Sequence, residues 1–180
     1  AAAAPADWTG TLTIAGIQSK PVVLDATDTA ITAAAKVNAT TEATGVSAIA
    51  RNVSLFSVDP AGIPGSFTLA VKGDNATAAN VTFSATANTP AGLAEAVKSF
   101  NDVSSQTGIT AKLNTDGTAI ILTNEAGANI DIANAASSSG AVALAAQNAE
   151  ASLSSGALTF ETAPGFSAAA GASTVTMGTL

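Results

Sequence analysis

The sequence predicts an α+β fold made of two repeated lobes, each ordered strand, strand, helix, strand, strand, with mainly antiparallel sheets. In several short stretches apolar residues alternate with polar ones, which is the period of a half-buried strand. Two longer stretches carry apolar residues at the spacing of one helical face. A third observation, a short unit that occurs twice, divides the chain into two similar parts.

The repeated unit recurs at a fixed offset of 63 residues. The stretch 44–48 (Thr-Gly-Val-Ser-Ala) matches 107–111 (Thr-Gly-Ile-Thr-Ala), and the dipeptides 37–38 and 100–101 coincide as well. Such a repeat indicates one supersecondary unit used twice. Its candidate structural residues are Val37, Asn38, Thr44, Gly45 and Val46 in the first copy and Phe100, Asn101, Thr107, Gly108 and Ile109 in the second.

The second copy contains the clearer predicted helix, over 90–106. Thr89 is a favourable N-cap, and Pro90 suits the first helical position. Gly108 is expected to end the helix, because glycine readily adopts the left-handed conformation of a C-terminal cap.

The first copy contains the weaker helix, predicted over 28–43. It is rich in alanine and threonine, so its amphipathic pattern is less marked. Thr27 and Asp28 are expected to cap its start, and Gly45 its end.

Strands are predicted on both sides of the first helix. Residues 8–24 form a hairpin with Gly16 in the turn, and Pro21 indicates that the returning strand starts there or lies at a sheet edge. Two more strands, 46–50 and 53–58, follow the helix and are joined by a tight turn near Arg51-Asn52.

We place the boundary to the second lobe within the Pro- and Gly-rich stretch 59–65. Its predicted strands are 66–72, a strand opening at Val81 and Phe83, the hairpin 109–113 and 118–123 across Asp116-Gly117, and 129–132. The predicted division is therefore a first lobe over 1–59, a second over 60–135 and a C-terminal segment over 136–180.

The C-terminal segment is rich in serine and alanine. Residues 136–155 are compatible with a short helix or an ordered loop, whereas 158–161 and 173–177 read as strands. These strands are expected to complete a sheet begun near the N-terminus or to return to a common stalk.

The composition argues against several classes of function. The 180 residues are 47% hydrophobic but only 4% aromatic and 11% charged, so the core should be thin. The net charge of -7 argues against nucleic acid, which needs a basic surface, and offers no basic patch to an anionic membrane. No uncharged run is apolar enough to span a bilayer.

The chain has no cysteine, histidine or tyrosine. Disulfides, thiol catalysis and thiolate metal sites are thereby excluded, and the usual general base is missing. We therefore expect that the chain is not an enzyme and that it binds neither a metal ion nor a cofactor.

Charged pairs that could suggest acid–base chemistry have simpler readings. Glu95 and Lys98 lie three apart on a predicted helix, where a solvated surface pair is expected. Lys36 and Glu42 could also suggest an acid–base pair, but nothing else in the sequence supports catalysis there. Asp25 and Asp28 flank the first helix start, where carboxylates favour the helix dipole.

Other possible sites are weaker still. Asp116-Gly117 resembles part of a calcium loop, but the acidic ligands that should follow at alternate positions are missing. Trp8 could stack on a sugar, although a lone Trp near a strand start more often packs on the edge of a core. Asn-x-Ser/Thr sequences occur at Asn38, Asn52, Asn75 and Asn80, as chance allows in a chain of this composition.

The repeated unit resembles the "IN" motif of bacterial flagellins and hook-associated proteins. The resemblance rests on the strand ending Ile14-Ala15-Gly16, the helix dipeptides Val37-Asn38 and Phe100-Asn101, and the two Thr-Gly strand entries. It covers roughly residues 8–133. The family usually has Ile-Asn-Gly at the turn and Ile-Asn in the helix, and the second copy here has a longer polar turn over 73–80.

The resemblance implies a structural, extracellular protein of the bacterial flagellum. In that family long terminal helices build the filament and the variable middle projects outward. This sequence contains none of those helices, so it is expected to be a surface-exposed outer domain cut from a longer chain and monomeric by itself. Its partners would be other flagellin subunits, through the terminal helices, and possible O-linked glycans, with Ser137–Ser139 and Ser154–Ser155 as candidate sites.

Two alternatives stay open. The chain could be the central domain of a hook–filament junction protein or of a filament cap. It could instead be an adhesin-like carbohydrate-binding module, which would be expected to have a groove lined with aromatic residues.

Overall fold

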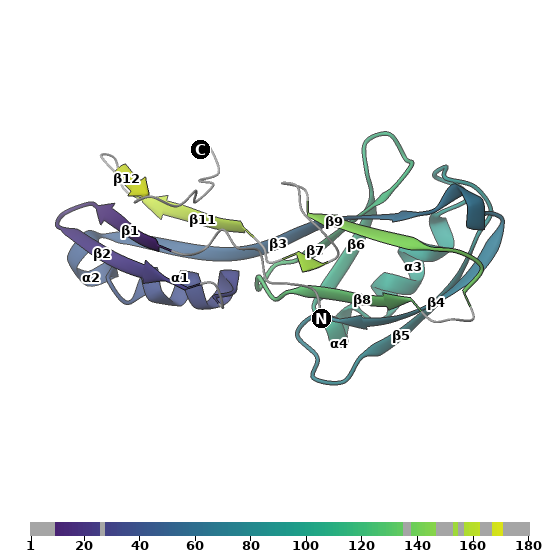
Figure 1. Ribbon diagram of the computed structural model, residues 1–180, viewed down its shortest axis with the longest axis horizontal. Helices are drawn as coiled ribbons and strands as arrows, with labels where there is room; N and C mark the ends of the chain where they lie inside the picture. The colour runs from purple at the N-terminus through teal and green to yellow at the C-terminus, as the bar shows by residue number, and fades with distance from the viewer. Residues whose placement is uncertain are drawn as a thin grey trace.

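The structure is a computed structural model that describes residues 10–25, 28–134, 138–146, 153–154, 157–162 and 167–170. It is a mixed fold of antiparallel sheets with few helices, and it is elongated, with one long strand running through both halves (Figure 1). Every strand pair among these residues is antiparallel.

One end of the molecule is a three-stranded sheet ordered β12-β1-β2. Strands β1 (Gly10–Ala15) and β2 (Ser19–Leu24) form the predicted hairpin, and Pro21 lies on β2 at the sheet edge, as expected. Strand β12 (Ser167–Ala170), which the sequence did not indicate, pairs with β1. The strand predicted over 158–161 is present as β11 (Ala157–Thr162), but it pairs with residues 46–51 and not with the N-terminal hairpin. The strand predicted over 173–177 lies outside the described residues.

The first helix region differs from its prediction in two ways. It is divided into α1 (Ala30–Asn38) and α2 (Thr41–Thr44), so the single helix over 28–43 is wrong. Its N-cap is Thr29 rather than Asp28, because the Thr29 and Thr32 side chains each accept a hydrogen bond from the other residue's backbone N–H. Thr27 lies outside the described residues.

Strand β3 (Val46–Val58) is the long strand, and it corrects the prediction of two strands with a turn near Arg51-Asn52. The chain stays extended because partners continue on both sides of that dipeptide. Arg51 pairs with Ala157 in β11 (Ala157–Thr162), and Asn52 pairs with Asn124 in β7 (Ile120–Asn124).

The other half contains a four-stranded sheet ordered β10-β8-β4-β5. It is reached through a 3-10 turn, η2 (Pro60–Gly62). Its strands are β4 (Gly65–Lys72), β5 (Ala79–Ala85), β8 (Ile130–Asn134) and the short β10 (Leu153–Ser154). The predicted alternation along β4 is confirmed, with Phe67, Leu69 and Val71 buried on one face.

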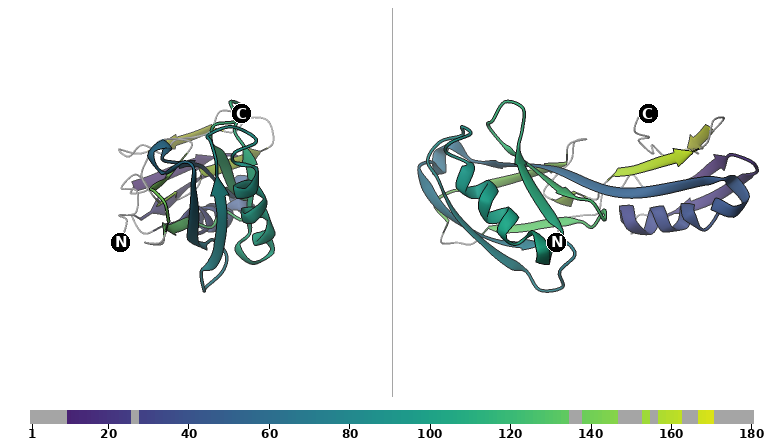
Figure 2. Two further views of the ribbon diagram at one scale, coloured as in Figure 1. Left: turned by 90° about the vertical axis from the view of Figure 1, so that its right-hand side faces the viewer. Right: turned by 180° about the vertical axis from the view of Figure 1, so that it is seen from behind.

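The second helix region is divided in the same way, into α3 (Ala94–Asp102) and α4 (Ser104–Thr107). The regular helix begins later than the predicted residue 90. A turn precedes it, in which Thr89 accepts hydrogen bonds from the backbone N–H groups of Gly92 and Leu93. Figure 2 shows α1 and α3 on separate halves of the molecule, with β3 running through both.

The hairpin predicted across Asp116-Gly117 is confirmed as β6 (Ile109–Leu113) and β7. These strands belong to a five-stranded sheet ordered β11-β3-β7-β6, in which β9 (Val142–Ala146) also pairs with β3. The helix considered for 136–155 is therefore wrong over β9. Residues Ser54 to Val58 of β3 pair with β9 and hold it extended.

Two separate clusters of buried apolar residues form the core. The first contains only small and medium side chains, with Val37 and Val46 among them. The second holds four phenylalanines, Phe56, Phe67, Phe83 and Phe100. Strand β3 contributes to both clusters: its residues up to Ala50 belong to the first and those from Phe56 onward to the second. The lobe boundary was predicted at 59–60.

Candidate functional site

The residues singled out in the repeated unit meet at two places, which we call joint 1 and joint 2. Joint 1 is the turn from α2 into β3 with the end of α1, and joint 2 is the turn from α4 into β6 with the end of α3. Joint 1 contains Val37, Asn38, Thr44, Gly45 and Val46, and joint 2 contains Phe100, Asn101, Thr107, Gly108 and Ile109.

A left-handed glycine ends the helix at each joint. Gly45 has φ 71° and ψ 12°, and Gly108 has φ 67° and ψ 6°. Each donates its N–H to the carbonyl of the first residue of the short helix, at 2.7 Å from Thr41 and 2.8 Å from Ser104. The chain can therefore leave the helix directly into a strand, a turn that a residue with a Cβ would strain.

The threonine before each glycine is buried and satisfied locally. Thr44 Oγ1 donates to the Thr40 carbonyl at 2.9 Å and accepts from Val46 N–H at 3.2 Å. Thr107 Oγ1 donates to Val103 at 3.1 Å and accepts from Ile109 N–H at 3.2 Å. A hydroxyl is needed in both places because it must donate and accept at once.

The asparagine at each joint connects the long helix to the strand that follows. Asn38 Nδ2 donates to the Ala48 carbonyl at 2.9 Å, and Asn38 Oδ1 accepts from Ala48 N–H at 2.7 Å. Asn101 makes the same two bonds with Ala111, at 3.0 and 2.8 Å. An amide carries one donor and one acceptor side by side, so it can satisfy both backbone groups of a single residue.

A second glycine at each joint lets the preceding hairpin approach. A Cβ built on Gly16 would lie 1.9 Å from the Thr44 carbonyl oxygen, and one on Gly73 would lie 2.2 Å from that of Thr107. The next residues, Ile17 and Asp74, donate their N–H to the same two carbonyls, each at 2.9 Å. The sequence indicated Gly16 as a turn residue, but not that Gly73 has the same contact.

The two joints differ in their apolar surroundings. Val37 and Val46 are buried in the first cluster, among alanines and aliphatic residues. Phe100 and Ile109 are buried in the second, where the Phe100 ring meets that of Phe56 edge-on with centroids 5.2 Å apart. The two joints therefore share their polar contacts but are packed against different core residues.

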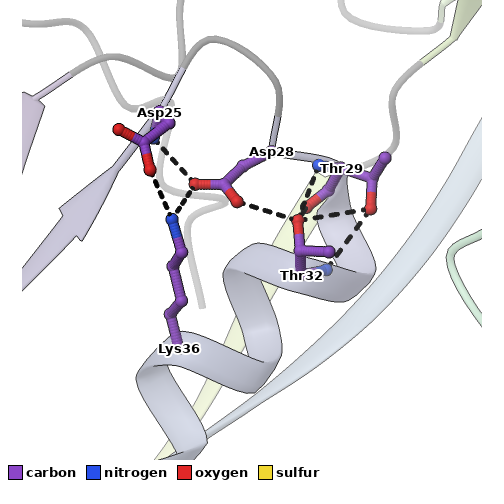
Figure 3. Close-up of polar contacts among 5 residues, drawn as sticks. All are labelled: Asp25, Asp28, Thr29, Thr32 and Lys36. Atoms are coloured by element: carbon purple, nitrogen blue, oxygen red, sulfur yellow. Dashed lines mark hydrogen bonds and ion pairs between the residues drawn. The ribbon is translucent and has the colours of Figure 1, made fainter.

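Polar side chains before α1 form an ion-pair network that the sequence did not indicate (Figure 3). Lys36 Nζ lies 2.8 Å from Asp25 Oδ2 and 2.5 Å from Asp28 Oδ2. Asp28 also accepts from the Asp25 N–H at 2.7 Å and from the Thr32 hydroxyl at 3.0 Å. The two aspartates, expected to act on the helix dipole, therefore also hold a lysine from the second turn of α1.

Protonation of this network follows from its contacts. Burial of the Asp28 carboxylate acts to raise its pKa, but hydrogen bonds, first among them the one from Lys36, outweigh burial and bring the pKa below its ordinary value. Hydrogen bonds to Asp25 and then to Asp28 raise the pKa of Lys36. Each group is thereby held in its charged form, which suits a structural ion pair.

The other charged pairs weighed from the sequence are placed differently. Lys98 pairs with Asp102, one helical turn on, at 2.5 Å, and not with Glu95. Both side chains of that pair are more than half exposed, so it is a surface pair. Lys36 binds the two aspartates rather than Glu42.

Several residues considered for glycans are engaged in the fold. Ser138 exchanges hydrogen bonds with the Thr68 backbone, and Ser139 Oγ accepts from Ser66 N–H at 2.9 Å. Asn38 is held at joint 1, and Asn52 is fully buried. The other candidate serines, Ser137, Ser154 and Ser155, and likewise Trp8, have no described side chain.

Among the described residues, no three acidic side chains lie close enough together to hold a metal ion. Within the described ranges, each helix is too short or too polar to span a lipid bilayer. No family model and no curated protein matches the chain.

Proposed function

We propose that this chain is the surface-exposed outer domain of a flagellin, a non-enzymatic structural part of the extracellular bacterial flagellar filament that serves motility and surface presentation. One observation carries the proposal. The residues that resemble the flagellin motif form the same set of contacts twice, with Asn38 bridging Ala48 and Asn101 bridging Ala111.

We also propose that the two halves descend from one unit of strand, strand, helix and strand. The matching glycine, threonine and asparagine contacts at joints 1 and 2 support this arrangement. A further strand was predicted after this unit in each copy. In the first copy, its place is taken by the continuation of β3 into the second half. A single continuous strand would connect the two halves mechanically, which suits a projecting domain.

The pairing of β1 with β12 suits a domain inserted in a longer chain. The register places Leu12 opposite Ala170, so the start of β1 lies beside the end of β12. These two described strand ends therefore lie side by side. A segment of this kind can project from a filament whose subunits associate through helices elsewhere in the polypeptide.

The carbohydrate-binding alternative receives less support from the described aromatic residues. Phe56, Phe67, Phe83 and Phe100 are all buried in the second core cluster. None of these rings offers a face to a sugar. The acidic, polar composition is better suited to a solvated outer layer.

Gold-labelled antibodies against the purified chain, applied to intact cells of the source organism, test the proposal. Labelling along the whole filament is the expected result. Labelling only at the base or only at the tip would assign the chain to a junction protein or to a cap. Labelling of the cell envelope with bare filaments would contradict a flagellar function and favour an adhesin.

A further inference from the structure

We propose that Asn101 closes the free edge of β6 against strand addition by a second copy of this chain, and that Asn38 closes the edge of β3 in the same way. This inference does not depend on the flagellar function. It concerns what prevents the isolated domain from associating through its sheets.

Strand β6 is the terminal strand of the five-stranded sheet, with β7 on one side of it. Ala111, at its centre, directs both its N–H and its C=O to the Asn101 amide, at 2.8 and 3.0 Å. These are the two groups that an added antiparallel strand would bind. The side chain from α3 thus occupies the position of a neighbouring strand.

The residue before Ala111 on the same edge is closed as well. Ile109 N–H donates to Thr107 Oγ1 at 3.2 Å. Ile109 and Ala111 are two apart, so their backbone groups point to the same side of the strand. An incoming strand would therefore have to displace both Asn101 and Thr107.

The corresponding edge of β3 is closed at the same two positions. Val46 N–H donates to Thr44 Oγ1 at 3.2 Å, and the Val46 carbonyl accepts from Thr41 Oγ1 at 2.7 Å. The Ala48 groups are both held by Asn38. The repeated unit therefore supplies polar side chains in place of a missing strand in both halves.

Two other edge strands carry different devices with the same consequence. Pro21 lies on β2, an edge strand, and has no N–H to offer. On β5, the edge of the four-stranded sheet, the Thr82 carbonyl accepts from Ser99 Oγ of α3 at 2.9 Å. Four of the strand edges in the described part of the chain therefore carry a proline or a side-chain contact that an added strand would have to overcome.

A second copy of β6 is the occupant that the sequence best suits. In an antiparallel self-pairing centred on Ala111, Ile109 faces Leu113 and Thr110 faces Lys112. The apolar residues then oppose each other, and neither lysine faces the other, so no like-charge repulsion opposes the pairing. Removal of Asn101 would free both backbone groups of Ala111 and leave only the contact between Ile109 N–H and Thr107 Oγ1 for an added strand to displace.

The test is the oligomeric state of the full chain carrying Asn101→Ala, measured by light scattering after size exclusion over a concentration series. We expect the native chain to remain monomeric and the variant to form dimers whose fraction rises with concentration. The oligomeric state of Asn38→Ala tests the edge of β3 in the same way. If circular dichroism shows that Asn101→Ala does not fold, the result for Asn38→Ala tests the proposal in its place.

Two controls separate edge opening from general destabilisation. Ala96→Gly weakens α3 while leaving Asn101 in place, and it should stay monomeric even where its melting temperature falls as far. Adding Ala111→Pro to Asn101→Ala removes the exposed N–H and should restore the monomer. A monomeric Asn101→Ala at every concentration, equal association of Ala96→Gly, or no rescue by the proline would overturn the proposal.

Discussion

The Asn101 amide holds Ala111 by both of its backbone groups, at 3.0 Å from the carbonyl and 2.8 Å from the N–H. Asn38 holds Ala48 in the same way, at the same separation of ten residues. The two pairs attach a helix to a strand in two different cores. They are the most specific structural consequence of the repeat.

Replacing Asn101 by alanine should lower the free energy of unfolding by about 1–3 kcal/mol, because two partly buried backbone groups lose their partner. Urea denaturation measures the change. Asn80→Ala is the matched control: Asn80 is exposed on β5, so its replacement should change stability by less than about 0.5 kcal/mol. Equal effects of the two substitutions would contradict the bridging function of Asn101.

Alanine at the two left-handed glycines should be unequally tolerated. Gly45→Ala should cost about 1–2 kcal/mol, the usual penalty for a Cβ in this conformation. Gly108→Ala should cost more. Its Cβ would lie 1.9 Å from Asp74 Oδ2, and moving Asp74 away would break the hydrogen bond that it accepts from the buried Asn124 amide at 2.9 Å, whereas the Cβ of Gly45 meets only Ile17 at 3.2 Å.

The same denaturation measurement applies to both glycine variants, and their order is the informative result. If Gly45→Ala were the more destabilised of the two, the close seating of Asp74 over Gly108 would be wrong.

Stability should fall in acid through the loss of the Asp28 interactions. The pKa of Asp28 is lowered on folding, so its contribution is present above the ordinary value of 3.8 and is lost as pH falls through the lower folded pKa. Asp28→Asn should therefore be less stable than the native chain at pH 6, with a difference that shrinks in acid.

Thermal melting from pH 2 to pH 7 checks this dependence on Asp28. Asp102→Asn, which breaks the exposed pair with Lys98, is the control and should change stability by about 0.5 kcal/mol or less. A destabilisation of Asp28→Asn that was constant over the whole range would rule out the charged interaction as its source.

The two cores should respond separately to truncation. Phe100→Ala removes a fully buried ring that touches Phe56 and Phe83, and should cost about 3–5 kcal/mol. Val37→Ala empties space in the other cluster. Amide hydrogen exchange should show lost protection centred on the half that contains each substitution, and uniform loss from either one would indicate a single core.

What could be predicted from the sequence was local. Gly45, Gly108 and the hairpin turn at Asp116-Gly117 act through their own backbone conformations and neighbours, and the structure places each where the pattern indicated. The bridging contacts of the asparagines could not be predicted, although the repeat marked the residues themselves.

The errors came from distant partners. Arg51-Asn52 reads as a turn because both residues are polar, yet Asn52 is fully buried and donates to the carbonyl of Ala128, 76 residues away. Strand β9 has the composition of a helix, but pairing with β3 keeps it extended. Neither partner lies within the window that a local pattern samples.

The most direct test of the flagellar account is the sequence of the parent gene on both sides of this segment. An outer domain of flagellin should be flanked on both sides by long amphipathic helical arms, which would build the filament and leave this chain projecting from it. Flanks without such arms, or with a secretion signal and further repeats, would contradict the account and indicate an adhesin.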